Sequence, residues 1–322
     1  MMKDGAWWSN SWNPLVGTKG RFHCHRVSEA CTNCWAAEMN RRFRGPDYTV
    51  GADQIRLDGR VLMQPLCWRK PRRIFVCSMT DLFHEQVSPD WIDSILEVMA
   101  ACPQHTFICL TKRPERMEEL IYGVTEDCPS RELGGGDYLP NVWFGVTAEN
   151  QERANERIPH LVKIPAKVRW VSVEPMLGPV DLTEWLGGED GTGLGGYGIR
   201  PALSWVVGGG EATARSPRPT HPQWARDLRD QCQAAGVAFW WKQWGSWCHV
   251  DQMHPDVAVR VDAAVNLAGN PIRTFRVGKK AAGRLLDDRE WSEQPAMVVP
   301  TTPRPVDAGS PFERESVRSE AS

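Results

Sequence analysis

Three cysteines near the N-terminus have the spacing of ligands to a single inorganic centre. Cys24, Cys31 and Cys34 form the pattern C-x6-C-x2-C within the segment WNPLVGTKGRFHCHRVSEACTNCWAAEMNRR. Thiolates are the ligands of iron–sulfur clusters and of many zinc sites, and three of them in one polar, glycine-containing loop can converge. Free thiols are the third interpretation, but such a tight group would be prone to oxidation.

Spacing alone leaves two kinds of centre open. Three cysteines can hold a [4Fe–4S] cluster and leave one iron open, whereas a fourth ligand from His23 or His25 would make a structural zinc site. Structural zinc usually stabilises a small module without a core, and this chain is long enough to bury a large core. The cysteines also follow the first predicted strand, on the same edge as other polar groups. Location therefore favours the cluster.

The elements that must position this loop are short, almost continuously apolar runs. Such runs indicate parallel strands covered on both faces. An early strand is predicted within Ala6–Trp12, and the later ones are predicted within Arg73–Met79, Thr106–Arg113, Val142–Thr147, Val168–Pro175, Ser204–Glu211 and Val237–Gly245.

Helical patterns separate these strands. Ser88 and Pro89 are a typical helix start, with a capping hydroxyl followed by proline. Trp224, Leu228 and Cys232 recur every four residues before Gly236, where a helix is expected to end. Alternating strands and helices predict an α/β fold with a parallel sheet. Because nearly every strand is followed by polar residues, we expect a partial or complete (β/α) barrel with its active-site loops on one rim.

Composition limits the class of protein. The 322 residues carry a net charge of -2 and contain no run of eighteen apolar residues, and the first residues lack a basic region followed by an apolar run, so we expect neither a membrane span nor a secretory signal. Ten cysteines without such a signal indicate a reducing compartment, so we expect a cytoplasmic protein. Residues 1–297 are expected to form the barrel domain and residues 298–322 a disordered polar tail. The glycine-rich segment Gly187–Gly198 neither follows an apolar strand nor opens a helix, so it is expected to be a flexible loop.

Several longer motifs resemble one known family. The sequence W-N-P, followed by the cysteine pattern and Trp35-Ala36, is similar to the phage-associated radical-SAM-like family called Gp thirty-seven/Gp sixty-eight. The resemblance covers about residues 7–297, and Trp35 departs from it because the family commonly has Tyr there. The further matching motifs are SMTDLFHE, LTKRPERM, NVWFGVTAEN, RWVSVEPMLGPVDL, WVVGGGE, FWWKQWG and KKAAGRLLDDREW.

The resemblance implies a radical-SAM-type partial barrel with the cluster loop after the first strand. Cys24, Cys31 and Cys34 would each bind one iron of a [4Fe–4S] cluster, and S-adenosylmethionine would bind the fourth. Reductive cleavage of this cofactor would yield a 5′-deoxyadenosyl radical that abstracts hydrogen from a substrate. An electron donor is then also required.

Polar residues after the strands are the candidate cofactor ligands. Ser78, Thr80 and Asp81 occupy the position at which the family places acceptors for the cofactor's ammonium group, although Asp81 is equally suited to cap a turn. Thr147 and Glu149 could reach ribose hydroxyls or form a surface turn. Glu174 could face the pocket or form a structural ion pair. Backbone at Gly208, Gly209 and Gly210 can approach the cofactor closely, with Glu211 behind it.

Basic residues on the same rim suggest the substrate. Lys112, Arg113, Lys242 and Gln243 are the candidate catalytic residues, beside Trp240, Trp241 and Trp244. Together they would suit a flat, anionic substrate such as a nucleotide or nucleic acid. In the alternative interpretation these cations balance Asp81, Glu174 and Glu211, and the tryptophans are core residues. The alternative function is a non-enzymatic protein in which zinc or a static cluster shapes a surface for a macromolecular partner.

Overall fold

The computed structural model describes residues 6–17, 21–43, 54–121, 139–186, 202–213, 216–253, 256–257, 264–266 and 273–296. The segment predicted to be a flexible loop, 187–198, and the tail predicted over 298–322 lie outside these residues. Among the helices that are described, none is long and apolar enough to cross a membrane.

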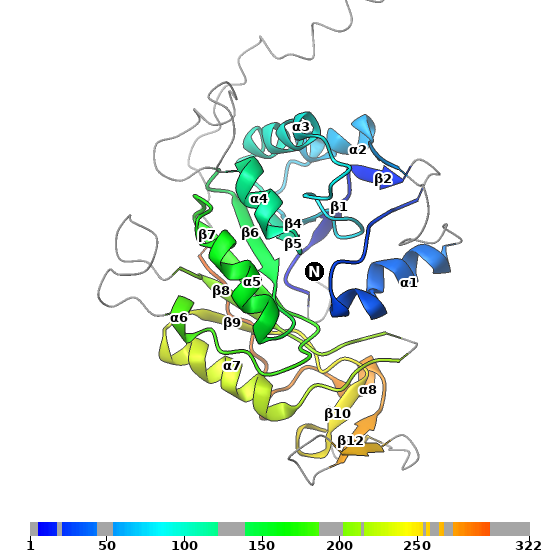
Figure 1. The fold of residues 1–322 in the computed structure, drawn as a ribbon, viewed down its shortest axis with the longest axis vertical. Coiled ribbons are helices and arrows are strands. Elements are labelled where there is room, and N and C mark those ends of the chain that lie inside the picture. Colours follow the sequence, from blue (N-terminus) through cyan, green and yellow to red (C-terminus); the bar gives the residue numbers. More distant parts are fainter. Residues whose placement is uncertain are drawn as a thin grey trace, which may run out of the picture.

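A seven-stranded parallel sheet, curled into a half-barrel, forms the centre of the molecule (Figure 1). Its strands lie side by side in the order in which the chain presents them, apart from two short strands after the first. This confirms the predicted partial barrel at the level of architecture. The strands are β1 (Asn10–Trp12), β4 (Arg73–Val76), β5 (Thr106–Thr111), β6 (Val142–Thr147), β7 (Val168–Val173), β8 (Trp205–Gly208) and β9 (Ala238–Trp241).

Helices follow the strands and cover the outer face of the half-barrel (Figure 1). Two predicted boundaries are confirmed. Ser88 accepts a hydrogen bond from the backbone of Trp91 at the start of α3, and α7 ends just before Gly236, whose φ of +65° suits glycine. The helices are α1 (Trp35–Arg42), α2 (Gly59–Leu62), α3 (Pro89–Ala100), α4 (Pro114–Ile121), α5 (Gln151–Leu161), α6 (Thr183–Leu186), α7 (Pro222–Ala234) and α8 (Lys279–Ala282).

Smaller elements surround the half-barrel. Strands β2 (Leu15–Gly17) and β3 (Ile55–Leu57) pair antiparallel beside the cysteine loop, within which Glu29–Asn33 form a 3-10 helix. A separate antiparallel sheet has the order β10–β12–β11. Its strands are β10 (Trp247–His249), β12 (Arg273–Arg276) and β11 (Ala264–Asn266).

Alternate residues of the sheet point to different cores. One face packs against the helices, and the inner face carries a layer of tryptophans from several strands and from the N-terminal segment. Gly145 makes room for this layer, since a Cβ there would lie 2.4 Å from the indole of Trp170. The inner cluster consists of Trp7, Ile108, Trp143, Val168, Trp170, Trp205, Val207 and Trp240. The half-barrel is therefore filled with side chains below its carboxyl edge.

Candidate functional site

Register brings the predicted site residues to one edge. Val173, Gly208 and Trp241 pair directly with their neighbours across β7, β8 and β9, so the residues that follow them start from the same level. Thr147 of β6 pairs with Ser172 of β7 in the same way. All strands of this sheet are parallel, and their carboxyl ends therefore meet at one rim, as the sequence predicted.

Arg113, directly after β5, joins the cysteine loop to this rim. Its Nη1 lies 4.0 Å from the sulfur of Cys24 and donates to the carboxylate of Asp81 at 3.1 Å. Its Nε donates to Glu85 at 2.7 Å, and its Nη2 lies 3.5 Å from the carbonyl oxygen of His25. A single guanidinium thus contacts the loop after β4 and the loop that carries the cysteines.

The middle of the cysteine loop is held by the start of α5. Asn150, the N-cap of that helix, donates a hydrogen bond to the carboxylate of Glu29, and Arg153 forms an ion pair with the same carboxylate at 3.3 Å. These bonds lower the pKa of Glu29, although its own partial burial opposes them. Glu29 therefore remains an anion that anchors the loop near the end of β6.

The last part of the loop is held by Glu211 after β8. Asn33 donates to Glu211 Oε2 at 2.9 Å and to the carbonyl of Ser216 at 2.8 Å. Arg218 pairs with the same carboxylate, its Nη2 lying 2.5 Å from Oε1, and donates to the carbonyl of Glu29 at 3.0 Å. The carboxylate of Glu211, predicted to bind the cofactor, is thus engaged in the structure by Asn33 of the cysteine loop and by Arg218.

The three candidate metal-binding cysteines lie near enough to influence one another's thiols. Burial, the Asp81 carboxylate and the nearby Cys34 and Cys31 raise the pKa of Cys24 to about 12, while the Arg113 guanidinium opposes this effect. Burial likewise raises the pKa of Cys34. Without a metal these two thiols are therefore protonated at neutral pH, and a metal would have to displace their protons.

Asp81, the predicted acceptor for an ammonium group, has four partners within the protein. Its carboxylate accepts from Thr111 Oγ1 at 2.7 Å, from the backbone of Phe83 at 3.0 Å and of Lys112 at 3.2 Å, and from Arg113. Only 7% of this residue is exposed. The arrangement matches the turn-capping interpretation, and a ligand would have to compete with these donors.

Glu174 meets the two candidate catalytic residues that follow β9. Its carboxylate accepts from Lys242 Nζ at 2.8 Å and from Gln243 Nε2 at 3.0 Å. Gly209 lies against it, since a Cβ there would be 3.2 Å from the Glu174 carboxyl carbon. Lys242 also stands 5.3 Å from the centre of the half-buried Trp8 ring. Glu174 is thus both on the rim and in an ion pair, which combines the two interpretations of the sequence.

Thr147 and Glu149 point to different surroundings. Lys112 Nζ lies 3.4 Å from the hydroxyl of Thr147, on the rim. Glu149 is fully buried and forms a 3.0 Å ion pair with Arg157, which is also buried. A buried carboxylate requires such a partner. The structure therefore holds Glu149 beneath the rim.

The remaining predicted ligands support the loops. Ser78 donates to Asn13 at 3.2 Å, and Thr80 donates to the carbonyl of His23 at 2.8 Å, which ties the loop after β4 to the cysteine loop. A Cβ on Gly208 would lie 3.0 Å from the ring of Trp241, so this glycine permits close packing on the helix side of the sheet.

The tryptophans expected beside the basic residues are core residues. Trp241 and Trp244 are almost fully buried in the core shared with the helices, and Trp240 belongs to the inner cluster. The core interpretation of these three side chains is thus the one the structure supports. The half-buried Trp8, which packs against the inner cluster, is an aromatic ring close to the Lys242 ammonium group.

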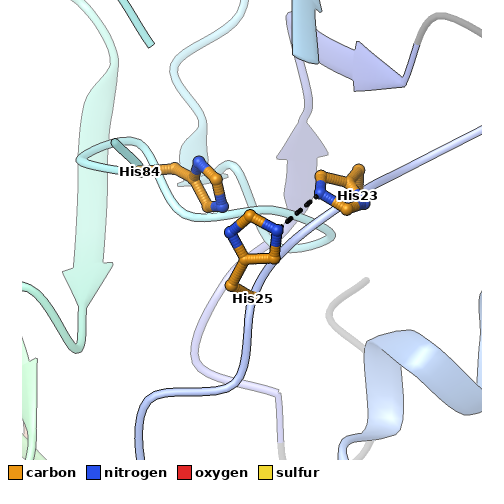
Figure 2. Close-up of side chains that lie close together, drawn as sticks. All are labelled: His23, His25 and His84. Atoms are coloured by element: carbon orange, nitrogen blue, oxygen red, sulfur yellow. Dashed lines mark hydrogen bonds between the residues drawn. The ribbon is translucent and has the colours of Figure 1, made fainter. Parts of the chain in front are cut away.

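Sequence reasoning missed His84, which lies in the loop after β4. Figure 2 shows its ring together with those of His23 and His25, and one coordinating atom from each of the three lies within 4.8 Å of the others. Burial and the nearby Arg113 lower the pKa of His84 to about 4, so its ring is neutral at pH 7. The only signal in the sequence was a histidine beside Glu85 in the polar loop after a strand.

Fold and site together define a parallel α/β half-barrel protein with a cysteine loop fixed across its carboxyl edge. A family model described as "Protein of unknown function (DUF5131)" matches residues 4–295, and the chain belongs to this family. No curated protein matches the chain, and neither does any solved structure.

Proposed function

We propose that this protein is a radical S-adenosylmethionine enzyme, like the phage-associated family its motifs resemble. Cys24, Cys31 and Cys34 would hold a [4Fe–4S] cluster by three irons, leaving the fourth for S-adenosylmethionine. The observation that carries this proposal is the cysteine loop itself. Its residues His25, Glu29 and Asn33 bond to Arg113, Asn150 and Glu211, each of which follows a different strand at the edge where the polar side chains of a half-barrel gather.

The donor set fits a cluster better than a single ion. Zinc with thiolate bonds of about 2.3 Å would need sulfur atoms about 3.8 Å apart. Within the described part of the chain, the groups close enough to hold one ion do not include the three cysteines. Yet Cys31 and Cys34 both lie near enough to influence the thiol of Cys24. We therefore favour a centre larger than one ion, such as a cluster with three thiolate ligands.

A cluster bound here would supply one electron to cleave S-adenosylmethionine and produce the 5′-deoxyadenosyl radical that attacks the substrate. The chain's own task is to orient the two molecules and exclude water. The buried indoles of Trp7, Trp170 and Trp205 exclude water from the barrel interior below the rim. Thr147 ends β6 and Glu174 follows β7, so these two polar side chains at the carboxyl edge would help to hold the cofactor.

Two lysines on the rim favour an anionic substrate, such as a nucleotide or a nucleic acid. The ammonium group of Lys112 makes no ion pair with a described residue and lies 3.4 Å from the hydroxyl of Thr147. Lys242 stands over Trp8, and its charge is balanced by Glu174. A flat ring could stack on Trp8 while a phosphate approaches Lys112. An electron donor and a reducing, cytoplasmic environment belong to the same proposal.

The test is anaerobic reconstitution with iron and sulfide, followed by reduction in the presence of S-adenosylmethionine. We expect about three to four irons per chain, visible absorbance that changes on cofactor addition, and formation of 5′-deoxyadenosine without added substrate. One tightly bound zinc per chain at the cysteines, with no response to the cofactor, would reject the enzyme and support the binding protein. The assay needs no knowledge of the natural substrate.

A further inference from the structure

Three histidines form a compact group beside the cysteine loop. His23 and His25 flank Cys24, and His84 reaches them from the loop after β4 (Figure 2). The centre of the His25 ring lies 4.8 Å from the centre of the His23 ring and 4.8 Å from that of the His84 ring, so His25 lies between the other two histidines. His23 and His84 are fully buried, whereas His25 is half-buried and gives access to the group.

We propose that His23, His25 and His84 bind a divalent transition-metal ion, zinc in the first place, at a site separate from the cysteine centre. Tetrahedral zinc with Zn–N bonds of about 2.0–2.1 Å requires nitrogen atoms about 3.4 Å apart. The Nε2 atoms of His23 and His25 are 3.2 Å apart. One coordinating nitrogen of each ring lies within 4.8 Å of the other two, so closing the group around one ion requires them to approach by about 1.4 Å at most.

A buried nitrogen of His84 points to a missing ligand. Its Nε2 is buried and has no hydrogen-bond partner among the described residues, whereas its Nδ1 accepts from the backbone of Gln86 at 3.1 Å. A polar atom left in this state costs free energy, which a metal bond would recover. The observation is independent of the spacing between the rings.

Glu85 is placed to orient His84 when the metal binds. Coordination through Nε2 replaces the proton on that atom, so the neutral ring must carry its proton on Nδ1. The Glu85 carboxylate lies 3.6 Å from Nδ1 and can accept this proton in a hydrogen bond in place of the Gln86 contact. Metal-binding histidines commonly donate their second N–H to a carboxylate.

The charged side chains beside the group comprise two carboxylates and one guanidinium, which leaves one net negative charge to face a bound cation. The carboxylates of Glu85 and Asp81 face the cation of Arg113, which also lies close to His25 and Cys24. Neutral imidazole suits zinc, copper, iron and nickel, and three such ligands leave one coordination position for water or a substrate atom. An oxygen or nitrogen atom of a further ligand could therefore bind the metal ion at this open position, beside the cysteine loop.

The test uses the full-length protein with Cys24, Cys31 and Cys34 all replaced by Ser, which removes every thiolate of the other centre. After chelator treatment and equilibrium dialysis against zinc, we expect one zinc per chain. His25→Gln in this background should lower zinc affinity at least about 100-fold, and Glu85→Gln about 10–100-fold. His160→Gln is the matched control, because His160 lies on α5 and pairs with Glu118.

Cobalt gives a second readout, in the wild-type protein as well. Cobalt bound at the histidines should give absorbance bands that disappear in the His25→Gln and His84→Gln variants. The bands that disappear should not include a thiolate-to-metal charge-transfer band. Failure of the cysteine variant to bind zinc while it keeps the wild-type circular dichroism, or equal binding by the His25→Gln variant, would overturn the site. Because the cysteines are absent, either result is distinguishable from failure of the iron–sulfur proposal.

Discussion

Asn33 donates a hydrogen bond to Glu211 at 2.9 Å, across 178 residues of sequence. Asn33 stands between Cys31 and Cys34, and Glu211 follows β8. The bond joins the two ends of the candidate site. Glu211 is only 4% exposed although it lies at the rim. Its buried charge is tolerated because Arg218 neutralises it and Asn33 donates a hydrogen bond to it.

Replacing this anchor should loosen the cysteine loop. Glu211→Ala removes the carboxylate that Asn33 and Arg218 share as an acceptor, so we expect a loss of about 1–3 kcal/mol in the free energy of unfolding. Denaturant unfolding measures this loss, and metal analysis should show weaker iron retention. Glu119→Ala, on the exposed side of α4, is the control and should change neither. Wild-type iron retention in Glu211→Ala would show that the loop does not depend on this anchor.

The ligand assignment predicts a clear division among the cysteines. Cys24→Ala, Cys31→Ala and Cys34→Ala should each lose most of the reconstituted iron, because each removes one of three ligands. Cys232→Ala should retain it, since Cys232 is buried on α7 and distant in sequence from the loop. Iron and sulfide analysis after anaerobic reconstitution provides the measurement. Similar iron contents in all four variants would contradict the assignment.

Asp81 tests whether one carboxylate serves the fold, the cofactor, or both. Asp81→Asn removes the charge that faces Arg113, and both side chains are less than 10% exposed. We expect about 1–3 kcal/mol less stability in urea unfolding without any ligand, because the buried guanidinium of Arg113 then keeps only the more exposed Glu85 as a charged partner. If the carboxylate also accepts from S-adenosylmethionine, calorimetry should show affinity weakened by about 1.5–3 kcal/mol. The control is Asp90→Asn on the exposed start of α3.

The tryptophan layer predicts an unusual sensitivity at Gly145. A Cβ there would lie 2.4 Å from the Trp170 ring, so Gly145→Ala should destabilise the protein by about 1–3 kcal/mol or more. Trp170→Phe should rescue part of this loss, because the smaller ring relieves the overlap. Gly59→Ala is the matched control. Nothing lies within 4 Å of its Cβ position in α2, so stability should stay unchanged or rise by up to about 1 kcal/mol. Thermal unfolding compares the variants, and equal melting temperatures would contradict the packing argument.

Asp287 predicts a pH dependence of stability at low pH. Hydrogen bonds from Arg226, Arg229 and Gln252 lower its pKa from 3.8 to about 2, although partial burial opposes them. A lowered pKa in the folded state stabilises the protein above pH 3.8, and this contribution is lost as pH falls toward 2. Because Asp287 is partly exposed, we expect about 1 kcal/mol or less.

Asp287→Asn removes this titration and suits the position, since Asp287 has a φ of +52° that Asn tolerates. The difference in urea stability between wild type and variant should be constant above pH 4 and shrink between about pH 4 and 2. A difference that does not change over this interval would show that Asp287 does not titrate with the lowered pKa.

The sequence by itself determined the strands, many helix boundaries and the edge on which the chemistry lies. The apolar run Val142–Thr147 forms a strand with the predicted bounds. A strand covered on both faces is apolar throughout, so the change to polar residues marks where it ends. Ser88 and Gly236 likewise mark a helix start and a helix end through interactions with residues next to them in the chain, so the sequence alone could predict both boundaries. Polar residues after parallel strands must meet at one rim whatever the details of packing.

Only the tertiary structure decided which of these residues meet. Asp81 with Arg113, Glu211 with Asn33, and His84 with His23 are pairs whose members lie far apart in the chain. Their contacts depend on how far one loop reaches across the ends of several strands, and local sequence preferences do not encode that distance. Spacing along the chain could reveal the three cysteines, but it could not reveal a histidine that joins its partners by crossing from another loop.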